Sequence, residues 1–153
     1  MTYFFYFLIF IVICIVAISI MSRIQPHLGL TGGRLKGGNN KPNWVCSESV
    51  NRGDASHYVN PINYNQESKD AWDSVKRIIF LSGGKIVKED DGKYLHATYV
   101  SQLLRFVDDL ELRLDETNKV IQLRSSSRVG YSDLGVNRKR VEKIIGEFKQ
   151  ITR

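Results

Sequence analysis

The chain opens with a hydrophobic stretch in which apolar side chains occupy every face of a helix. Residues 3–21 include no charged side chain, and 18 of these 19 residues are apolar. A helix of this length rises roughly 28 Å, close to the ~30 Å hydrocarbon core of a bilayer. The stretch predicts one transmembrane helix within residues 1–22, through which the protein contacts the membrane. A cleaved signal peptide stays open as an alternative, because Ala17 and Ser19 suit a cleavage site.

Glycine and proline concentrate between this stretch and the patterned part of the chain. Five of the twelve glycines fall between residues 22 and 41, and all three prolines come before Ile62. Such a composition is typical of a tether. We therefore expect an anchor over 1–22, a tether over 23–41 and a soluble domain over 42–153. Within that domain, residues 42–61 are expected to pack against a folded unit at 62–153.

Helical periodicity marks the two ends of the folded unit. Ser68 is a candidate N-cap, apolar residues then recur with one-sided helical spacing as far as Ile79, and Gly83 and Gly84 end the helix. A last helix is expected near the C-terminus, with a basic face opposite an apolar stripe. This stripe comprises Leu134, Val141, Ile144, Ile145 and Phe148.

Four strands are expected between the two helices. Residues 85–90 and 93–101 flank Asp91-Gly92, a dipeptide typical of a two-residue hairpin turn. Residues 105–114 and 119–129 follow, and both segments alternate apolar and polar side chains. This order predicts an α+β fold in which an antiparallel sheet is covered on one face by two helices.

The alternation also predicts how the last two strands pair. Their apolar residues must share the inner face, so the numbers of opposed residues should sum to an odd value. A sum of 235 places Glu111 opposite Arg124, and a sum of 233 places Asp109 there. Either register sets an outward carboxylate across from Arg124.

Charge and composition narrow the classes of partner. The net charge of +6 divides equally, because residues 22–60 and 61–153 each contribute +3. No strongly basic domain exists, so we expect no nucleic-acid partner. Cys14 lies in the apolar stretch and leaves Cys46 without a disulfide partner. The histidines lack metal-ligand spacing and no phosphate-binding glycine loop is present, so we expect no metal and no cofactor.

Polar residues gather where the apolar alternation of the third and fourth strands ends. Asp108 falls on the inner side, where an ionised carboxylate needs a partner, and Ser125 and Ser127 fall on the same side of the next strand. Their hydroxyl groups are candidate donors to Asp108. The candidate ligand-binding residues are Asp108, Asp109, Arg124, Ser125, Ser127, Arg128, Tyr131, Asp133, Asn137 and Arg138.

Three interpretations of this cluster stay open. In the first, the cluster is structural: serines satisfy Asp108, Asp133 caps the last helix and the arginines form surface pairs. In the second, Arg124, Arg128 and Arg138 bind a phosphate or a carboxylate. In the third, Asp108 serves a hydrolase or transferase, although Asp109, as its neighbour on a strand, points to the opposite face.

The same residues resemble a known family. Arg105-Phe106-Val107-Asp108-Asp109 and the long run from Arg124 to Arg138 resemble the domain of unknown function 1499 family, and the likeness extends over roughly residues 42–150. Pro42-Asn43-Trp44-Val45-Cys46-Ser47 is similar to that family's Pro-Asn-Cys-Val-Ser-Ser segment, with Trp44 in place of the cysteine. The resemblance implies a small membrane-associated or exported domain and adds no catalytic residue.

Together these features predict a single-pass, membrane-anchored binding or accessory domain. Its expected partner is an anionic ligand, a lipid headgroup or another protein, and a hydrolase or a purely structural module is the alternative. The resemblance to exported proteins favours an extracytoplasmic domain, whereas the basic residues after the apolar stretch favour the cytoplasmic side.

Overall fold

A computed structural model describes residues 2–48 and 53–152. The helices are α1 (Thr2–Met21), α2 (Ser68–Leu81) and α3 (Val136–Ile151). The short strands are β1 (Leu30–Thr31), β2 (Arg34–Leu35), β3 (Trp44–Cys46) and β4 (Ile62–Asn63). The long strands are β5 (Lys85–Asp90), β6 (Tyr94–Val100), β7 (Val107–Asp115) and β8 (Val120–Ser127).

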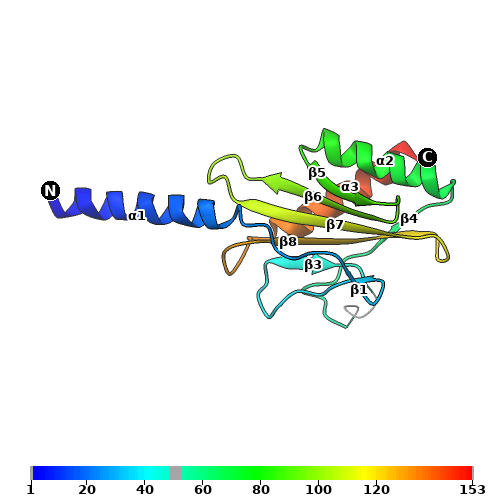
Figure 1. Cartoon of the computed structure of the whole chain (residues 1–153), viewed down its shortest axis with the longest axis horizontal. Coiled ribbons are helices and arrows are strands. Elements are labelled where there is room, and N and C mark those ends of the chain that lie inside the picture. The colour runs from blue at the N-terminus through cyan, green and yellow to red at the C-terminus, as the bar shows by residue number, and fades with distance from the viewer. Residues whose placement is uncertain (1, 49–52, 153) are drawn as a thin grey trace.

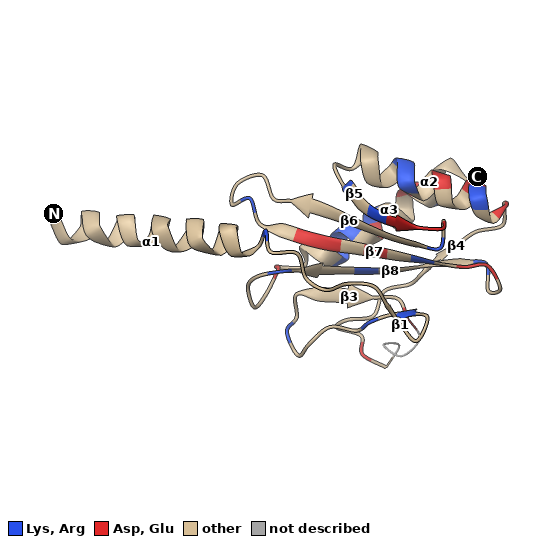
Figure 2. Cartoon of the chain, viewed as in Figure 1, with Lys and Arg blue, Asp and Glu red and all other residues tan. Residues whose placement is uncertain are grey.

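The first helix stands apart from the rest of the molecule. Figure 1 shows α1 projecting from one end of the sheet, and Figure 2 shows it without charged residues. Within the described residues, α1 is the one helix long and apolar enough to cross a membrane. A signal sequence near the N-terminus meets the same criteria. The structure therefore supports an apolar N-terminal helix that serves as an anchor or as a signal sequence.

An antiparallel sheet with helices on one face forms the domain. Its strand order is β3-β8-β7-β6-β5, and β4 pairs with the other end of β8. Helices α2 and α3 pack on the inner face, where their apolar stripes meet the leucines of β7 and β8 in one core. The predicted α+β class, with two helices over one sheet face, is confirmed.

The strand pairing follows the predicted alternation. Opposed residues of β7 and β8 sum to 235, so Leu112 faces Leu123 and Glu111 faces Arg124. The β5–β6 turn is the expected hairpin, because Asp91 and Gly92 both have positive φ angles, of 47° and 65°. The long strands lie within two residues of their predicted ends.

Two local predictions about the helices are wrong. The hydroxyl of Ser68 bonds to the Tyr64 hydroxyl at 3.0 Å, and Glu67 occupies the N-cap position of α2 without a side-chain hydrogen bond. Leu134 does not join the apolar stripe of α3, because the helix begins two residues later and this side chain is exposed.

The outer face of the sheet is covered as well. Residues 22–43 run across it, with β1 and β2 forming a small hairpin, and lead into β3 at the edge of the sheet. Leu35 packs against Trp44, Cys46 and Tyr94. We call residues 22–48 the arm. It includes the segment predicted as a tether, together with the first part of 42–61; residues 49–52 of that range lie outside the described residues. Because Asp109 and Glu111 are buried beneath the arm, their carboxylates need partners within the protein.

Candidate functional site

The predicted site residues divide between the two faces of the sheet. On the inner face, the Asp108 carboxylate accepts a hydrogen bond from Arg140 Nη2 at 2.7 Å. The same guanidinium donates through Nη1 to Ser125 Oγ at 3.0 Å and to Asn137 Oδ1 at 2.6 Å. A salt bridge to α3, and not the serines, therefore satisfies Asp108.

Asn137 completes this inner cluster. Its side-chain amide donates to Ser127 Oγ at 2.9 Å and to the carbonyl of Asn43 at 3.1 Å, while its Oδ1 accepts from Ser125. The side chain of Asn137 thus links α3 to the sheet and to the arm. The inner cluster holds α3 in register against β7 and β8, and its donors and acceptors are occupied by one another.

On the outer face, Asp109 lies at the centre of a buried charge network. Its carboxylate receives Arg128 through a bidentate pair, Nε to Oδ2 at 2.9 Å and Nη2 to Oδ1 at 2.7 Å, and His96 Nε2 lies 2.7 Å from Oδ1. Burial alone would raise the pKa of Asp109, but the hydrogen bonds from His96 and Arg128 hold it below 3.8. The carboxylate is therefore ionised at neutral pH.

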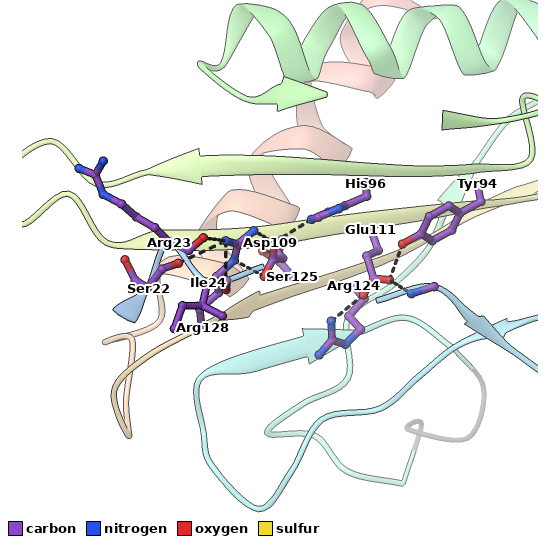
Figure 3. A network of polar contacts seen from close by, with 11 residues as sticks. Ser22, Arg23, Ile24, Tyr94, His96, Asp109, Glu111, Arg124, Ser125 and Arg128 are labelled. Atoms are coloured by element: carbon purple, nitrogen blue, oxygen red, sulfur yellow. Dashed lines mark hydrogen bonds and ion pairs between the residues drawn. The ribbon is translucent and has the colours of Figure 1, made fainter. Parts of the chain in front are cut away.

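Arg128 also holds the end of α1. Its Nη1 donates to the carbonyls of Ser22, Arg23 and Ile24 at 3.2, 3.4 and 3.4 Å (Figure 3). These carbonyls follow the last turn of α1, where a cation interacts favourably with the helix dipole. One arginine thus connects the apolar helix to the centre of the sheet through Asp109.

A second outer pair lies two residues further along β7. Glu111 Oε2 accepts from Arg124 Nη1 at 2.6 Å, and its Oε1 accepts from the Tyr94 hydroxyl at 2.7 Å and from the Gly29 amide at 3.1 Å (Figure 3). Burial and this hydrogen bond to Glu111 raise the pKa of Tyr94. Glu111 thereby joins β6, β8 and the arm.

Arg124 bonds to Glu111 through only one guanidinium nitrogen, Nη1. Its Nε is buried and has no hydrogen-bond partner among the described residues. In Arg128 the edge formed by Nε and Nη2 receives the carboxylate of Asp109. The corresponding edge of Arg124, formed by its Nε and Nη2, has the geometry that binds a carboxylate or phosphate through two parallel hydrogen bonds.

Arg124 lies on the wall of a cavity under the arm. This cavity, about 500 Å³ in volume, lies between the arm and the outer face, with Leu28, Lys36, Gly38 and Glu111 among its lining residues. A neighbouring cavity of about 160 Å³ reaches from Arg124 to Arg128 and Asp109. The first volume falls within the range of small-molecule sites.

The remaining predicted residues lie away from this cavity. Tyr131 is exposed on the β8–α3 loop, and Asp133 accepts the amides of Gly135 and Asn137 at the start of α3. Arg138 donates to the carbonyls of residues 55, 56 and 58. The structure brings together Asp108, Ser125, Ser127 and Asn137 on one face and Asp109, Arg124 and Arg128 on the other.

The pattern of the sequence missed two important partners. Arg140 is absent from the predicted cluster, although its position three residues after Asn137 places it on the same side of α3. His96 is absent from the predicted cluster, yet it is buried against Asp109. One signal could have indicated both residues: Asp108 and Asp109 are adjacent on a strand, so each carboxylate needs a cationic or donor partner on its own face of the sheet.

Chemistry at the cysteine is disfavoured by its surroundings. Burial raises the pKa of the Cys46 thiol, which keeps it protonated at neutral pH and weakens it as a nucleophile. Among the residues that the structure describes, no group of three or more histidine, cysteine, aspartate or glutamate side chains is placed to hold a metal ion.

These features define a small α+β domain with an apolar N-terminal helix and a buried charge network under an arm. The family described as proteins of unknown function, DUF1499, matches residues 34–148, and the chain belongs to this family. The resemblance inferred from the motifs is thereby confirmed. No curated protein matches the chain.

Proposed function

We propose that the protein is a membrane-anchored binding module that receives an anionic group at Arg124. The observation that carries this proposal is the buried Nε of Arg124, which has no partner among the described residues and belongs to a side chain on the cavity wall. Leaving a buried donor unsatisfied costs about 1–3 kcal/mol, and a ligand oxyanion would remove that cost.

The charges around the cavity favour an anion. Lys36 and Arg124 contribute to its lining, against the single carboxylate of Glu111. Glu111 is already engaged by three donors. A carboxylate or phosphate entering here therefore meets a net positive wall, while Leu28 and Leu30 offer apolar surface to the rest of a small organic ligand.

The position of the cavity favours a dissolved ligand over a lipid headgroup. The cavity is lined by residues of β1 and by the chain on either side of the β1–β2 hairpin. Figure 1 shows β1 beside the sheet and away from the end at which α1 leaves. A small molecule carrying a carboxylate or phosphate is thus the ligand class best suited to the site.

A hydrolase or transferase that uses Asp108 has less support. Asp108 is on the inner face and its carboxylate is paired with Arg140, whereas the cavity lies over the outer face. A purely structural role has a specific basis of its own, because the inner cluster is fully engaged within the protein. The experiment below therefore includes a structural outcome.

The test uses the full-length protein in nanodiscs of phosphatidylcholine, titrated with inorganic phosphate and with acetate. We expect the NMR signal of the Arg124 Nε–H group to shift and saturate. Calorimetry should show binding that Arg124→Gln weakens about tenfold or more, because a charge-assisted hydrogen bond contributes about 1.5–3 kcal/mol. Arg77→Gln, an exposed arginine on α2, is the matched control and should bind as the wild type does.

Three outcomes separate the alternatives. Unchanged anion binding in Arg124→Gln would contradict the site. If neither anion binds and Arg124→Gln only lowers the melting temperature, the role of Arg124 is structural. In a second arm, phosphatidylglycerol replaces part of the lipid, and a shift of the Arg124 signal without added anion would identify a headgroup as the ligand.

A further inference from the structure

We infer that the end of the domain around α1 rests on the bilayer, with two loops inserting apolar side chains among the lipid headgroups. The loops are the β6–β7 loop, residues 101–106, and the β8–α3 loop, residues 128–135. This inference rests on the proposed membrane anchorage by α1. It adds a membrane-contacting surface that is separate from the cavity at Arg124.

The end of α1 is held between the bases of these two loops. Ser22 is buried, and its hydroxyl accepts the Val107 amide, the first residue after the β6–β7 loop, at 3.3 Å. Arg128, the first residue of the β8–α3 loop, donates to the carbonyls that follow α1. Figure 1 shows both loops at the end of the sheet from which α1 leaves, beside its last turn. A helix that spans a bilayer along its own axis would bring both loops to the membrane surface.

The side chains presented there are large and apolar. Leu103 is 89% exposed, Leu134 is 86% exposed and Tyr131 is 69% exposed. None of these three side chains contributes to a core cluster of the domain. Leucines and a tyrosine at the level of a helix end are the combination found at membrane interfaces, where leucine enters the acyl boundary and tyrosine lies among the headgroups.

The β8–α3 loop is shaped to display its leucine. Leu134 has a positive φ of 54°, a conformation that is uncommon for leucine and brings its side chain no burial. Its amide donates to Ser132 Oγ at 3.2 Å, and the next amide donates to the Asp133 carboxylate at 3.1 Å. These bonds order the turn while leaving the leucine outside, which is consistent with a role outside the fold.

The charges near the loops suit a bilayer that contains anionic lipid. Arg23 and Arg105 are exposed, and the β6–β7 loop contains no acidic residue. The one carboxylate of the β8–α3 loop, Asp133, is engaged by amides at the start of α3. Basic side chains beside inserted leucines attract anionic headgroups to the same surface.

The test measures depth at single positions in the full-length protein, in nanodiscs of phosphatidylcholine and phosphatidylglycerol. A nitroxide is attached in turn to Leu103→Cys and Leu134→Cys in a Cys14→Ser background, where Cys46 is fully buried. Thr117→Cys, exposed in the β7–β8 turn at the opposite end of the sheet, is the matched control. Power saturation with oxygen and a water-soluble nickel complex reports the depth of each label.

We expect labels 103 and 134 to be more accessible to oxygen than to nickel, and label 117 to show the reverse. Water-like values at either loop position would overturn the inference. A label on native Cys14 in the otherwise unchanged chain tests the anchorage separately. If Cys14 reports hydrocarbon while the loops report water, the anchorage stands and the docking surface fails; if Cys14 also reports water, the anchorage itself fails.

Discussion

The carboxylate of Asp109 accepts hydrogen bonds from Arg128 and lies within hydrogen-bond distance of His96, and all three side chains are at least nine-tenths buried. Substituting Asp109→Asn leaves the Arg128 guanidinium without its countercharge. We expect the free energy of unfolding at pH 7 to fall by about 3–5 kcal/mol, measured by urea denaturation. Asp91→Asn, an exposed aspartate in the β5–β6 turn, is the control and should remain near the wild-type value.

The same residue predicts a pH dependence. Because the pKa of Asp109 is lower in the folded chain than its ordinary value of 3.8, its contribution to stability is complete above that value and is lost as the pH falls through the folded pKa. The wild-type protein should therefore lose stability more steeply than Asp109→Asn as the pH falls below 3.8. Parallel curves for the two proteins would show that the Asp109 network does not contribute in this way.

At the scale of elements, periodic segments were predictable and the arm was not. The alternation in 105–114 and 119–129 determined the faces of β7 and β8 and limited the register to odd sums, because a slip of one residue would bury Glu111 among leucines. The arm has no periodicity, and its glycines suggest a tether although it buries Leu35. The arm buries the carboxylates of the outer face, so only Arg124, which the register sets opposite Glu111, could be inferred as a partner from the pattern. The contacts of Asp109 with His96 and Arg128 could not.

The packing of the arm is itself testable. Glu48 accepts the Leu35 amide at 3.1 Å and Arg113 Nε at 2.9 Å, and thereby joins β2 to β7. We expect trypsin to cleave slowly after Arg34 and Lys36 in the wild-type protein. Cleavage there should be about tenfold faster in Glu48→Ala, because losing hydrogen bonds to a charged group costs about 1.5–3 kcal/mol and raises the open population.

Mass spectrometry of timed digests identifies the cleaved bonds. Glu116→Ala, an exposed glutamate in the β7–β8 turn, is the matched control. If the wild-type chain is cut after Arg34 before any other site, the segment behaves as a free tether and the packing is contradicted.

At the scale of the whole molecule, a chain of polar contacts through Arg128 joins the apolar helix to the sheet, beside the hydrogen bond from the Val107 amide to Ser22. It runs from the carbonyls that follow α1 through Arg128 to Asp109 on β7 and His96 on β6. The Arg128 guanidinium is hydrogen-bonded both to Asp109 and to the carbonyls after α1, and it restrains the junction much more than a glycine-rich linker would. The domain should therefore keep one orientation relative to α1, which is a condition of the proposed contact of both loops with the bilayer.

Substituting Arg128→Gln should release this orientation. Spin labels on Cys14 and on Thr117→Cys, in nanodiscs, report the distance between α1 and the far end of the sheet by double electron–electron resonance. We expect a narrow distance distribution in the wild-type background and a broad one in Arg128→Gln, because glutamine cannot reach both Asp109 and the carbonyls after α1. Arg138→Gln, which loses contacts to the carbonyls of residues 55, 56 and 58 and the ion pair with Glu142 but none to α1, should keep the narrow distribution. A circular-dichroism melt verifies that each variant is folded, and an equally narrow distribution in a folded Arg128→Gln protein would show that the helix is held by other contacts.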